Sequence, residues 1–375
     1  MILKQLHIIN FKSIATASMS FSPKVNCFIG LNGMGKTNIL DALHYLAFTK
    51  SHLGITDTLA VRRGQEAAVL DASYRSVQGD DRQLILQIRP GQRKILKRNK
   101  KEYDRLSEHI GQFPLVIVSP QDYQIILGGS EERRRFLDLQ LSQQDAVYMS
   151  ALSQYTKALQ QRNSLLKASG AHDALLDVLD LQLDRFAELI WERRRAFVAE
   201  FIPHFREIYR AIAEERDEVG LEYRSALDET SGRLYDLLHQ SRERDRLLGH
   251  TTQGVHRDDL LMMLADELIK RVGSEGQNKT FLISLKLAQY RLLSQRNAER
   301  PMLLLDDIFD KLDAERVGRI ISLVGGEDFG QIFITDTNRK YLDEIIHNWG
   351  EDYRIFGVEH GEITNLSANQ TTAVR

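Results

Sequence analysis

The chain has 375 residues, which is too long for one average domain and enough for two domains with a core each. Its 42% hydrophobic and 27% charged residues are typical of a folded globular protein, and six prolines leave little material for a disordered linker. With 50 basic and 52 acidic residues the formal charge is −2, which excludes a polycation that binds nucleic acid over its whole surface. Any DNA contact must therefore use a local patch.

The N-terminal sequence MILKQLHIINFKSI alternates like a strand and has no long apolar region with a cleavage site. No stretch approaches about eighteen uninterrupted apolar residues, so neither secretion nor membrane spanning is indicated. The single cysteine, Cys27, cannot form an internal disulfide, and its apolar neighbours predict a buried strand position. We therefore expect a reducing, cytoplasmic location.

Short strands dominate the first part of the chain, and one helix interrupts them near Lys36. The strands are expected at 3–9, 25–29, 67–74, 84–88 and 115–119. From Glu131 to Arg246 the apolar residues follow helical spacing and predict a helical lobe.

Gly170, Pro203 and Gly220 are expected to divide this helical lobe into separate helices rather than one long coiled coil. Strands and helices alternate again after residue 270, which predicts a parallel sheet. The expected elements there are a helix at 281–296, a strand at 302–305, a helix at 314–323 and a strand at 331–335.

A strand-to-helix segment fits the phosphate-binding pattern G-x-x-x-x-G-K-[ST] in both its sequence and its context. Its glycines let backbone N–H groups surround phosphates, Lys36 reaches the β- and γ-phosphates, and the Thr37 hydroxyl ligates Mg²⁺. The predicted ATP-binding residues are Gly30, Leu31, Asn32, Gly33, Met34, Gly35, Lys36 and Thr37. The alternative, an ordinary glycine-rich turn, is disfavoured by the flanking strand and helix.

The segment PMLLLDDIFDKLD places Asp306 and Asp307 at the end of an apolar strand, where the ligand crevice of a parallel sheet lies. Asp306 is predicted to hold Mg²⁺, and Asp307 to polarise the attacking water as general base. An aspartate pair in this position can also simply cap the next helix. The phosphate-binding loop elsewhere in the chain favours the first interpretation.

Ser274 and Gln277, in GSEGQNKT, form a capping-box pattern before an apolar helix. Taken alone, this segment is best explained as a helix cap. A capped, positively polarised helix start also recognises a γ-phosphate, so the two interpretations are compatible.

Six blocks in order resemble the RecF family of ABC-type ATPases, and they span nearly the whole chain. They are INFKSI, GLNGMGKTN, SPQDYQIILGGSEERRRFLD, GVHRDDL, SEGQNKT with LKLAQ, and LLLDDIFDKLD. The resemblance implies an α/β fold: an ABC-type P-loop ATPase head built from both chain ends, with an inserted, mainly helical second lobe. The implied division is 1–120 and 266–365 for the head, 121–265 for the helical lobe and 366–375 for a flexible tail.

The resemblance further implies a protein with weak ATPase activity that binds ATP and Mg²⁺ and dimerises when ATP is bound. The nucleotide on Lys36 of one chain would meet the ABC signature of the other, at Ser274, Gly276 and Gln277. The dimer would hold DNA, single-stranded or gapped as well as duplex. Its implied roles are recombinational repair, replication restart and SOS induction, with the mediators RecO and RecR as partners and no membrane contact.

Related ABC-type ATPases also couple Mg²⁺ to the second lobe through a glutamine after a strand, and Gln121 lies at about that position. A proline-favoured turn explains this glutamine equally well.

Three departures from the ABC pattern are visible. Asp307 replaces the usual glutamate and suggests slow hydrolysis. Thr335 and Asp336 stand where many relatives have a switch histidine, which leaves the γ-phosphate sensor open. Lys311 replaces an acidic residue.

Several basic or titratable groups have a structural interpretation that we favour over a functional one. The run at 93–101 is expected to be a solvated hairpin with Asn99 in its turn rather than a phosphate contact. At least one arginine in each of the trios 133–135 and 193–195 is expected to be structural, because successive helical residues face different directions. His256 is expected in a structural or dimer-contact loop rather than as a catalytic base, since no cysteine or histidine partner lies at metal spacing.

Two other classes compete with the RecF-like function. A P-loop phosphotransferase or ATP-fuelled nuclease would need an acceptor pocket or carboxylate cluster, and none is evident. A chromosome-organising head of the SMC-like class would carry long coiled-coil arms, but the interval between Lys36 and Ser274 is short and interrupted.

Overall fold

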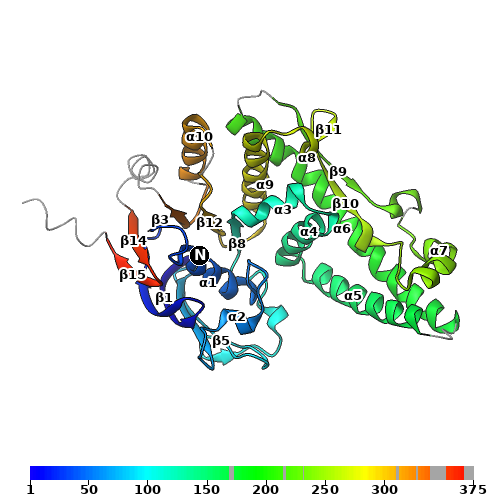
Figure 1. Cartoon of the computed structure of the whole chain (residues 1–375), viewed down its shortest axis with the longest axis horizontal. Helices are drawn as coiled ribbons and strands as arrows, with labels where there is room; N and C mark the ends of the chain where they lie inside the picture. Colours follow the sequence, from blue (N-terminus) through cyan, green and yellow to red (C-terminus); the bar gives the residue numbers. More distant parts are fainter. Residues whose placement is uncertain are drawn as a thin grey trace, which may run out of the picture. The chain divides into compact units, whose positions relative to one another are not determined.

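The computed structural model of the chain describes residues 1–168, 173–213, 217–230, 232–309, 312–326, 328–337 and 352–366. The chain folds as two compact units (Figure 1). Unit 1 consists of Met1–Asp122 and Lys286–Arg375, and unit 2 of Tyr123–Leu285. Both ends of the chain therefore build one unit, and the segment between them builds the other.

A mainly parallel sheet forms the centre of unit 1. Its strand order is β15-β14-β3-β13-β12-β8, with every neighbouring pair parallel except β14 and β15. The strands are β3 (Val25–Ile29), β8 (Leu115–Val118), β12 (Met302–Asp306), β13 (Ile332–Asp336), β14 (Tyr353–Glu359) and β15 (Glu362–Asn365). β8, β12 and β13 are buried along their whole length, as expected for strands covered on both faces.

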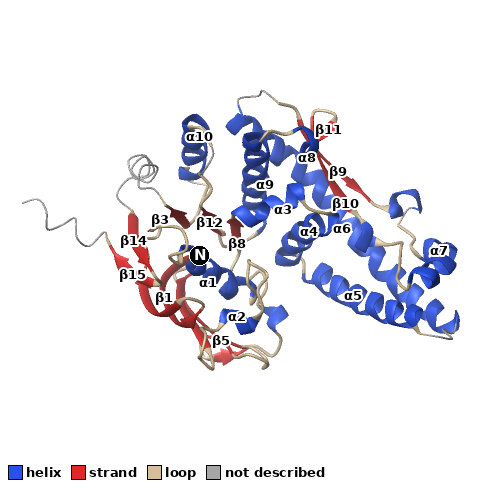
Figure 2. Ribbon diagram, viewed as in Figure 1, coloured by secondary structure: helices blue, strands red, loops and turns tan. Residues whose placement is uncertain are grey.

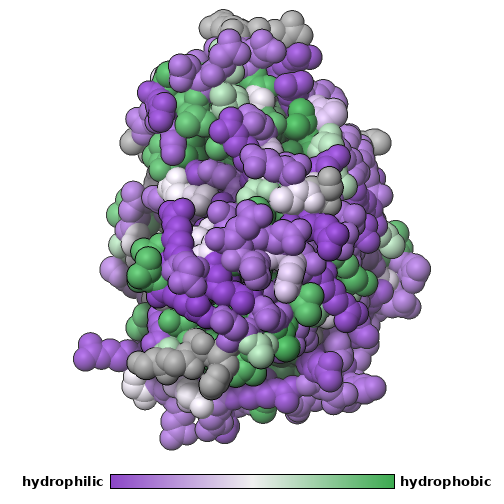
Figure 3. Space-filling model, turned by 90° about the vertical axis from the view of Figure 1, so that its right-hand side faces the viewer, coloured by the Kyte–Doolittle hydropathy of each residue, from purple (hydrophilic) through white to green (hydrophobic). Residues whose placement is uncertain are grey.

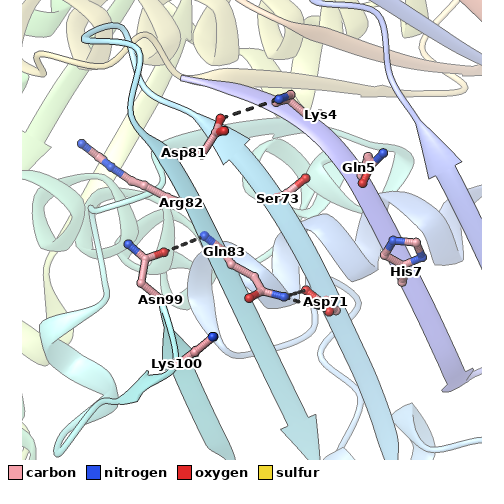
Figure 4. A pocket seen from close by; sticks show the side chains of 10 residues that line it. All are labelled: Lys4, Gln5, His7, Asp71, Ser73, Asp81, Arg82, Gln83, Asn99 and Lys100. Carbon is pink, nitrogen blue, oxygen red and sulfur yellow. Dashed lines mark hydrogen bonds and ion pairs between the residues drawn. The ribbon is translucent and has the colours of Figure 1, made fainter.

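A second, antiparallel sheet of unit 1 has the order β2-β1-β4-β5-β6-β7. Its strands are β1 (Ile2–Phe11), β2 (Ile14–Ser20), β4 (Ala68–Arg75), β5 (Asp81–Ile88), β6 (Ile95–Arg98) and β7 (Lys101–Glu102). One face is buried by alternate apolar residues such as Leu6, Leu70 and Leu86. The other face is polar, and Figure 4 shows Gln83 on it between Asp71 and Asn99, with hydrogen bonds to both.

Helix α1 (Lys36–Phe48) contacts strands of both sheets, and nearly all of its residues are buried. Unit 1 also contains α2 (Asp57–Ala60) and α10 (Ala314–Gly325). The helix that follows the phosphate-binding loop is therefore part of the core of the unit.

Unit 2 is mainly helical, as Figure 2 shows. Its helices are α3 (Tyr123–Leu127), α4 (Ser130–Gln144), α5 (Ala146–Lys167), α6 (Asp173–Ala213), α7 (Tyr235–Leu248), α8 (Ile269–Val272) and the first part of α9 (Glu275–Arg296). A three-stranded antiparallel sheet accompanies them, formed by β9 (Val219–Arg224), β10 (Asp259–Leu264) and β11 (Glu267–Leu268). The face seen in Figure 3 is largely hydrophilic, with apolar side chains scattered over it.

Pro203 does not end a helix, so the expected break at this residue is wrong. It lies inside α6, although proline lacks the N–H that the helix ladder needs. Buried side chains on both sides of it, including Phe197, Phe201 and Phe205, hold the helix in place. Tertiary packing therefore overrides the local preference. Gly220 lies in strand β9, and Gly170 lies outside the described residues.

The observed units differ in one respect from the division implied by the resemblance. Unit 2 extends to Leu285 rather than to about 265, because the signature segment and the start of α9 pack with it. Phe281 of α9, for example, lies 4.6 Å from Phe205 of α6, measured between ring centres. Lys311 and the tail after Leu366 lie outside the described residues.

Candidate nucleotide-binding site

The phosphate-binding loop runs from the end of β3 to the start of α1. Gly30 lies against the β14 backbone, where an added Cβ would stand 2.2 Å from the carbonyl oxygen of Val358. Gly33 and Gly35 have φ angles of 81° and 108°, a region that favours glycine. Close packing therefore excludes a side chain at Gly30, and the backbone conformation favours glycine at Gly33 and Gly35.

Lys36 and Thr37 occupy the first turn of α1, where unpaired N–H groups and the helix dipole favour an anion. The Lys36 ammonium is buried and donates to the carbonyl oxygens of Gly30 and Leu31, at 2.7 and 3.2 Å. The lysine thus bends back over the loop that precedes it. No side chain caps this helix start, since the cap residue is Gly35.

Asp306 ends strand β12 and accepts hydrogen bonds from two threonine hydroxyls. Thr37 donates to its two carboxylate oxygens at 2.9 and 3.1 Å, and Thr335 donates to Oδ1 at 2.6 Å. Burial raises the pKa of the Asp306 carboxyl, and the charge of Asp307 acts in the same direction. Thr335, Thr37 and Lys36 oppose that rise because each favours the ionised form. Asp306 and Thr37 therefore provide an oxygen-rich pair of the type that Mg²⁺ prefers.

Asp307 follows at the same sheet edge and has a left-handed backbone with φ of 45°. Its N–H donates to the Thr335 hydroxyl at 3.0 Å, and its side chain is half-buried. The unusual backbone turns the chain sharply after the strand, so the two carboxylates are held in different environments. Thr335 and Asp336, which stand in place of a switch histidine, lie at the end of the neighbouring strand β13.

Gln121 lies in the short turn that follows β8, at the same carboxyl edge of the parallel sheet. Its side chain is exposed, whereas the adjacent Asp122 is buried and caps the turn by accepting from the N–H of Ser119 at 2.8 Å. Unit 1 thus brings together the phosphate-binding loop, the aspartate pair and the Gln121 turn.

The signature segment belongs to unit 2. Ser274 and Gln277 form the expected capping box, in which the N–H of Ser274 donates to Gln277 Oε1 at 2.9 Å and the N–H of Gln277 donates to Ser274 Oγ at 3.2 Å. Ser274 is exposed at the start of α9, with Gly276 in the first helical turn. The segment therefore presents an accessible, capped helix start.

The expected hairpin and the expected structural arginines are confirmed. The run at 93–101 forms the β6–β7 hairpin, with Asn99 and Lys100 at positive φ in its turn. In each arginine trio one member is buried in ion pairs: Arg133 with Asp259 at 2.6 Å, and Arg194 with Asp138 and Asp258 at 2.8 and 3.0 Å.

His256 and Cys27 also take structural positions. The His256 ring contacts the Tyr155 hydroxyl at 2.7 Å, and burial lowers its pKa to about 4. Cys27 is buried in β3, and burial raises the pKa of its thiol well above the ordinary value. Neither group has the surroundings of a reactive residue.

Two residues that contact the candidate site were not predicted from the sequence. Ser13, in the β1–β2 turn, accepts from Asn38 Nδ2 at 2.8 Å and would lie 3.0 Å from a Cβ at Gly35. The sequence marked Thr335 only as a departure from the ABC pattern, but its hydroxyl bonds both the Asp306 carboxylate and the Asp307 N–H. A polar residue at the end of a buried strand was the available signal for Thr335; Ser13 had none beyond its place in INFKSI.

Comparisons with known proteins agree with this geometry. A family model described as an AAA ATPase domain matches residues 1–186. The chain is 60% identical over 363 residues to the DNA replication and repair protein RecF of Porphyromonas gingivalis, covering 97% of this chain and 100% of that protein. It is 54% identical to the protein of the same name from Parabacteroides distasonis, covering 97% and 99%.

The fold is similar to a solved structure of the recombination mediator protein RecF-ATPrS in the RecFOR pathway. The TM-score is 0.87 at 27% identity, and the match covers 97% of this chain and 98% of that one. The expected fold, an ABC-type ATPase head from both chain ends with an inserted helical lobe, is therefore confirmed. In the part of the chain that the structure describes, no helix has the length and apolarity needed to cross a membrane.

Proposed function

This chain belongs to the RecF family of DNA replication and repair proteins, and from that membership we propose that it is an ATP-dependent DNA clamp with weak ATPase activity. The observation that carries the proposal is the division of the ATP-site residues between the two units. The phosphate-binding and acidic residues lie together in unit 1, and the signature residues lie exposed in unit 2.

Each residue of unit 1 has a specific proposed task. The loop from Gly30 to Gly35 surrounds the phosphates with N–H groups, and Lys36 leaves its carbonyl partners to neutralise the β- and γ-phosphates. Thr37 and Asp306, with Gln121 as a further oxygen donor, would hold Mg²⁺, which screens phosphate charge when bound. Asp307 orients the attacking water as general base.

The signature residues complete the site of a second chain. Ser274, Gly276 and Gln277 offer the N-terminus of a long helix to the γ-phosphate, which is the interaction that a helix dipole favours. ATP would then join two chains, because its phosphates bind unit 1 of one chain and unit 2 of the other. Hydrolysis removes the γ-phosphate and with it the link.

The cellular role follows from the family. We propose action in recombinational repair, replication restart and SOS induction, in the cytoplasm, with RecR and RecO as partners that the dimer meets on DNA. We favour this RecF-like function over an SMC-like chromosome-structural or nuclease-associated role, because the match to RecF proteins spans 97% of the chain.

The test uses two variants of the full chain, Lys36→Arg and Ser274→Arg. We expect Lys36→Arg to weaken ATP binding, and Ser274→Arg to keep it but to lose ATP-dependent dimerisation and DNA retention. An equimolar mixture should regain part of both activities, because one of the two sites in a mixed dimer has neither substitution. Sedimentation and DNA-binding titrations at two salt concentrations measure this. Variants that dimerise and retain DNA like the parent would refute the clamp.

A further inference from the structure

A largely buried series of hydrogen bonds links helix α1, which follows the phosphate-binding loop, to the turn that carries Gln121. It begins at Asp41 on α1, which is 1% exposed and accepts from Ser51 Oγ at 2.8 Å and from the N–H of His52 at 2.6 Å. Asp41 also pairs with Lys12, at 2.5 Å between Oδ2 and Nζ. The carboxylate thus fixes the backbone of the segment that follows α1.

His52 is the next residue in this series of hydrogen bonds, between Asp41 and the 119–122 turn. Its Nε2 lies 2.7 Å from Ser119 Oγ and 3.8 Å from Asp122 Oδ2. The Ser119 hydroxyl donates to Asp122 Oδ2 at 3.2 Å, so its oxygen is available to accept from the Nε2–H of His52. This order of donors fits a neutral imidazole, and burial lowers the pKa of His52.

Asp122 is the last residue in this series of hydrogen bonds, and in the sequence it is the residue at which the first segment of unit 1 ends. Its second oxygen, Oδ1, accepts from the Lys286 ammonium at 3.0 Å, and both side chains are buried. Asp122 is the last residue of unit 1 before unit 2, and Lys286 is the first residue after it. This ion pair within unit 1 therefore joins the residues at which the polypeptide leaves the unit and re-enters it.

We propose that His52 is a positioning residue that holds the 119–122 turn, and with it Gln121, in register with the nucleotide-binding helix. The imidazole touches no reacting atom; it acts through Ser119 and Asp122. No other residue of the described chain is shown to bond both the α1 carboxylate Asp41 and the hydroxyl of this turn. Its role in turnover rests on the proposed ATPase function, whereas its role in holding the turn does not.

Two substitutions separate the hydrogen bond from the space that the ring fills. His52→Phe keeps a ring against His44, whose centre lies 5.2 Å away, but removes the donor. His52→Gln keeps an N–H donor at about the reach of Nε2. The matched control is His109→Phe, since His109 is a buried histidine of unit 1 that bonds the α1 carbonyl of Leu46 and, among the described residues, is not seen to bond the 119–122 turn.

Hydrogen exchange of the nucleotide-free chain tests the positioning directly. In His52→Phe we expect the amides of Ser119 and Asp122, which are bonded within the turn, to exchange about tenfold faster. His52→Gln should restore slow exchange, and His109→Phe should leave this peptide unchanged. Equal exchange in His52→Phe and the parent would overturn the proposal, even if no chain hydrolysed ATP.

ATP turnover is the second readout. His52→Phe should lower kcat about tenfold with the Kd for ATP within about threefold, because it leaves the proposed phosphate-binding residues from Gly30 to Thr37 unchanged. His52→Gln should recover most of kcat. If His109→Phe lost kcat equally, general destabilisation would explain the effect and the positioning role in turnover would fail. A parent chain that neither binds nor hydrolyses ATP would instead refute the proposed function.

Discussion

The hydroxyl of Thr335 donates to Asp306 Oδ1 at 2.6 Å and accepts the N–H of Asp307 at 3.0 Å. One side chain at the end of β13 thereby orients both acidic residues at the end of β12. Because Thr335 is fully buried, water cannot replace either bond. Thr335 stands where many ABC-type ATPases have a histidine, and here it orients Asp306 and Asp307, for which we propose the roles of Mg²⁺ ligand and general base.

Replacing Thr335 should therefore impair hydrolysis more than ATP binding. Thr335→Val keeps the shape but removes the hydroxyl, and we expect kcat to fall about tenfold and the Mg²⁺ requirement to rise. Thr335→Ser should stay close to the parent, since it retains the donor and acceptor. Steady-state hydrolysis across Mg²⁺ concentrations distinguishes the two, and a fully active Thr335→Val would show that the hydroxyl is dispensable.

The sequence predicted those parts of the site that are local in the chain. The phosphate-binding loop and the Ser274 cap could be predicted, because each is a short segment in which the residue types and their spacing determine the backbone conformation. The Thr335–Asp306 contact was not, because the strand order β3-β13-β12 cannot be read from one sequence. The contacts of His52 with Ser119 and of Asp122 with Lys286 join residues far apart in the chain, so no periodicity signals them.

The arginine trio at 193–195 gives a matched stability test. Arg194 is buried and pairs with Asp138 and Asp258, whereas Arg193 is 55% exposed and pairs with Asp145 at 3.1 Å. Arg194→Met leaves the buried carboxylate of Asp258 and the half-buried carboxylate of Asp138 without their cation, and should cost about 3–5 kcal/mol of unfolding free energy. Arg193→Met should change it by less than about 0.5 kcal/mol. Urea unfolding measures both, and similar losses would contradict the assignment of Arg194 as the structural arginine.

Buried histidines should make the fold sensitive to acid. Burial lowers the pKa of His109 and of His256 from 6.5 to about 4 each, so the folded state keeps both neutral. The unfolded chain binds these protons below pH 6.5, so the stabilisation is complete above that pH and falls as the pH drops toward 4. At pH 5 each of these two histidines should lower the unfolding free energy by on the order of 2 kcal/mol relative to pH 7.

Unfolding titrations between pH 7 and pH 4 measure that loss. His109→Gln should lose less stability on acidification than the parent, because it removes one of the histidines that bind a proton more readily in the unfolded chain. His7→Gln is the control, since His7 is exposed on the polar face of the antiparallel sheet. A parent chain with constant stability down to pH 5 would contradict the assignment of these histidines as neutral.

Gly30 and Gly33 should differ in their tolerance of a methyl group for a geometric reason. A Cβ at Gly30 would overlap the Val358 carbonyl oxygen. β14 cannot easily move away, because it pairs with β3 up to Gly357 and with β15 at Val358. A Cβ at Gly33 meets nothing within 4 Å and costs only the strain of a positive φ. We expect Gly33→Ala to lose about 1 kcal/mol of unfolding free energy and Gly30→Ala about 3 kcal/mol.

Gly54→Ala is the matched control outside the loop, since Gly54 also has a positive φ and open space around it. It should lose as much stability as Gly33→Ala and keep the parent's affinity for ATP. Gly30→Ala should lose ATP affinity as well, because the displaced backbone moves the N–H groups that surround the phosphates. If Gly30→Ala were as stable as Gly33→Ala, the close contact between the loop and β14 would not constrain the site.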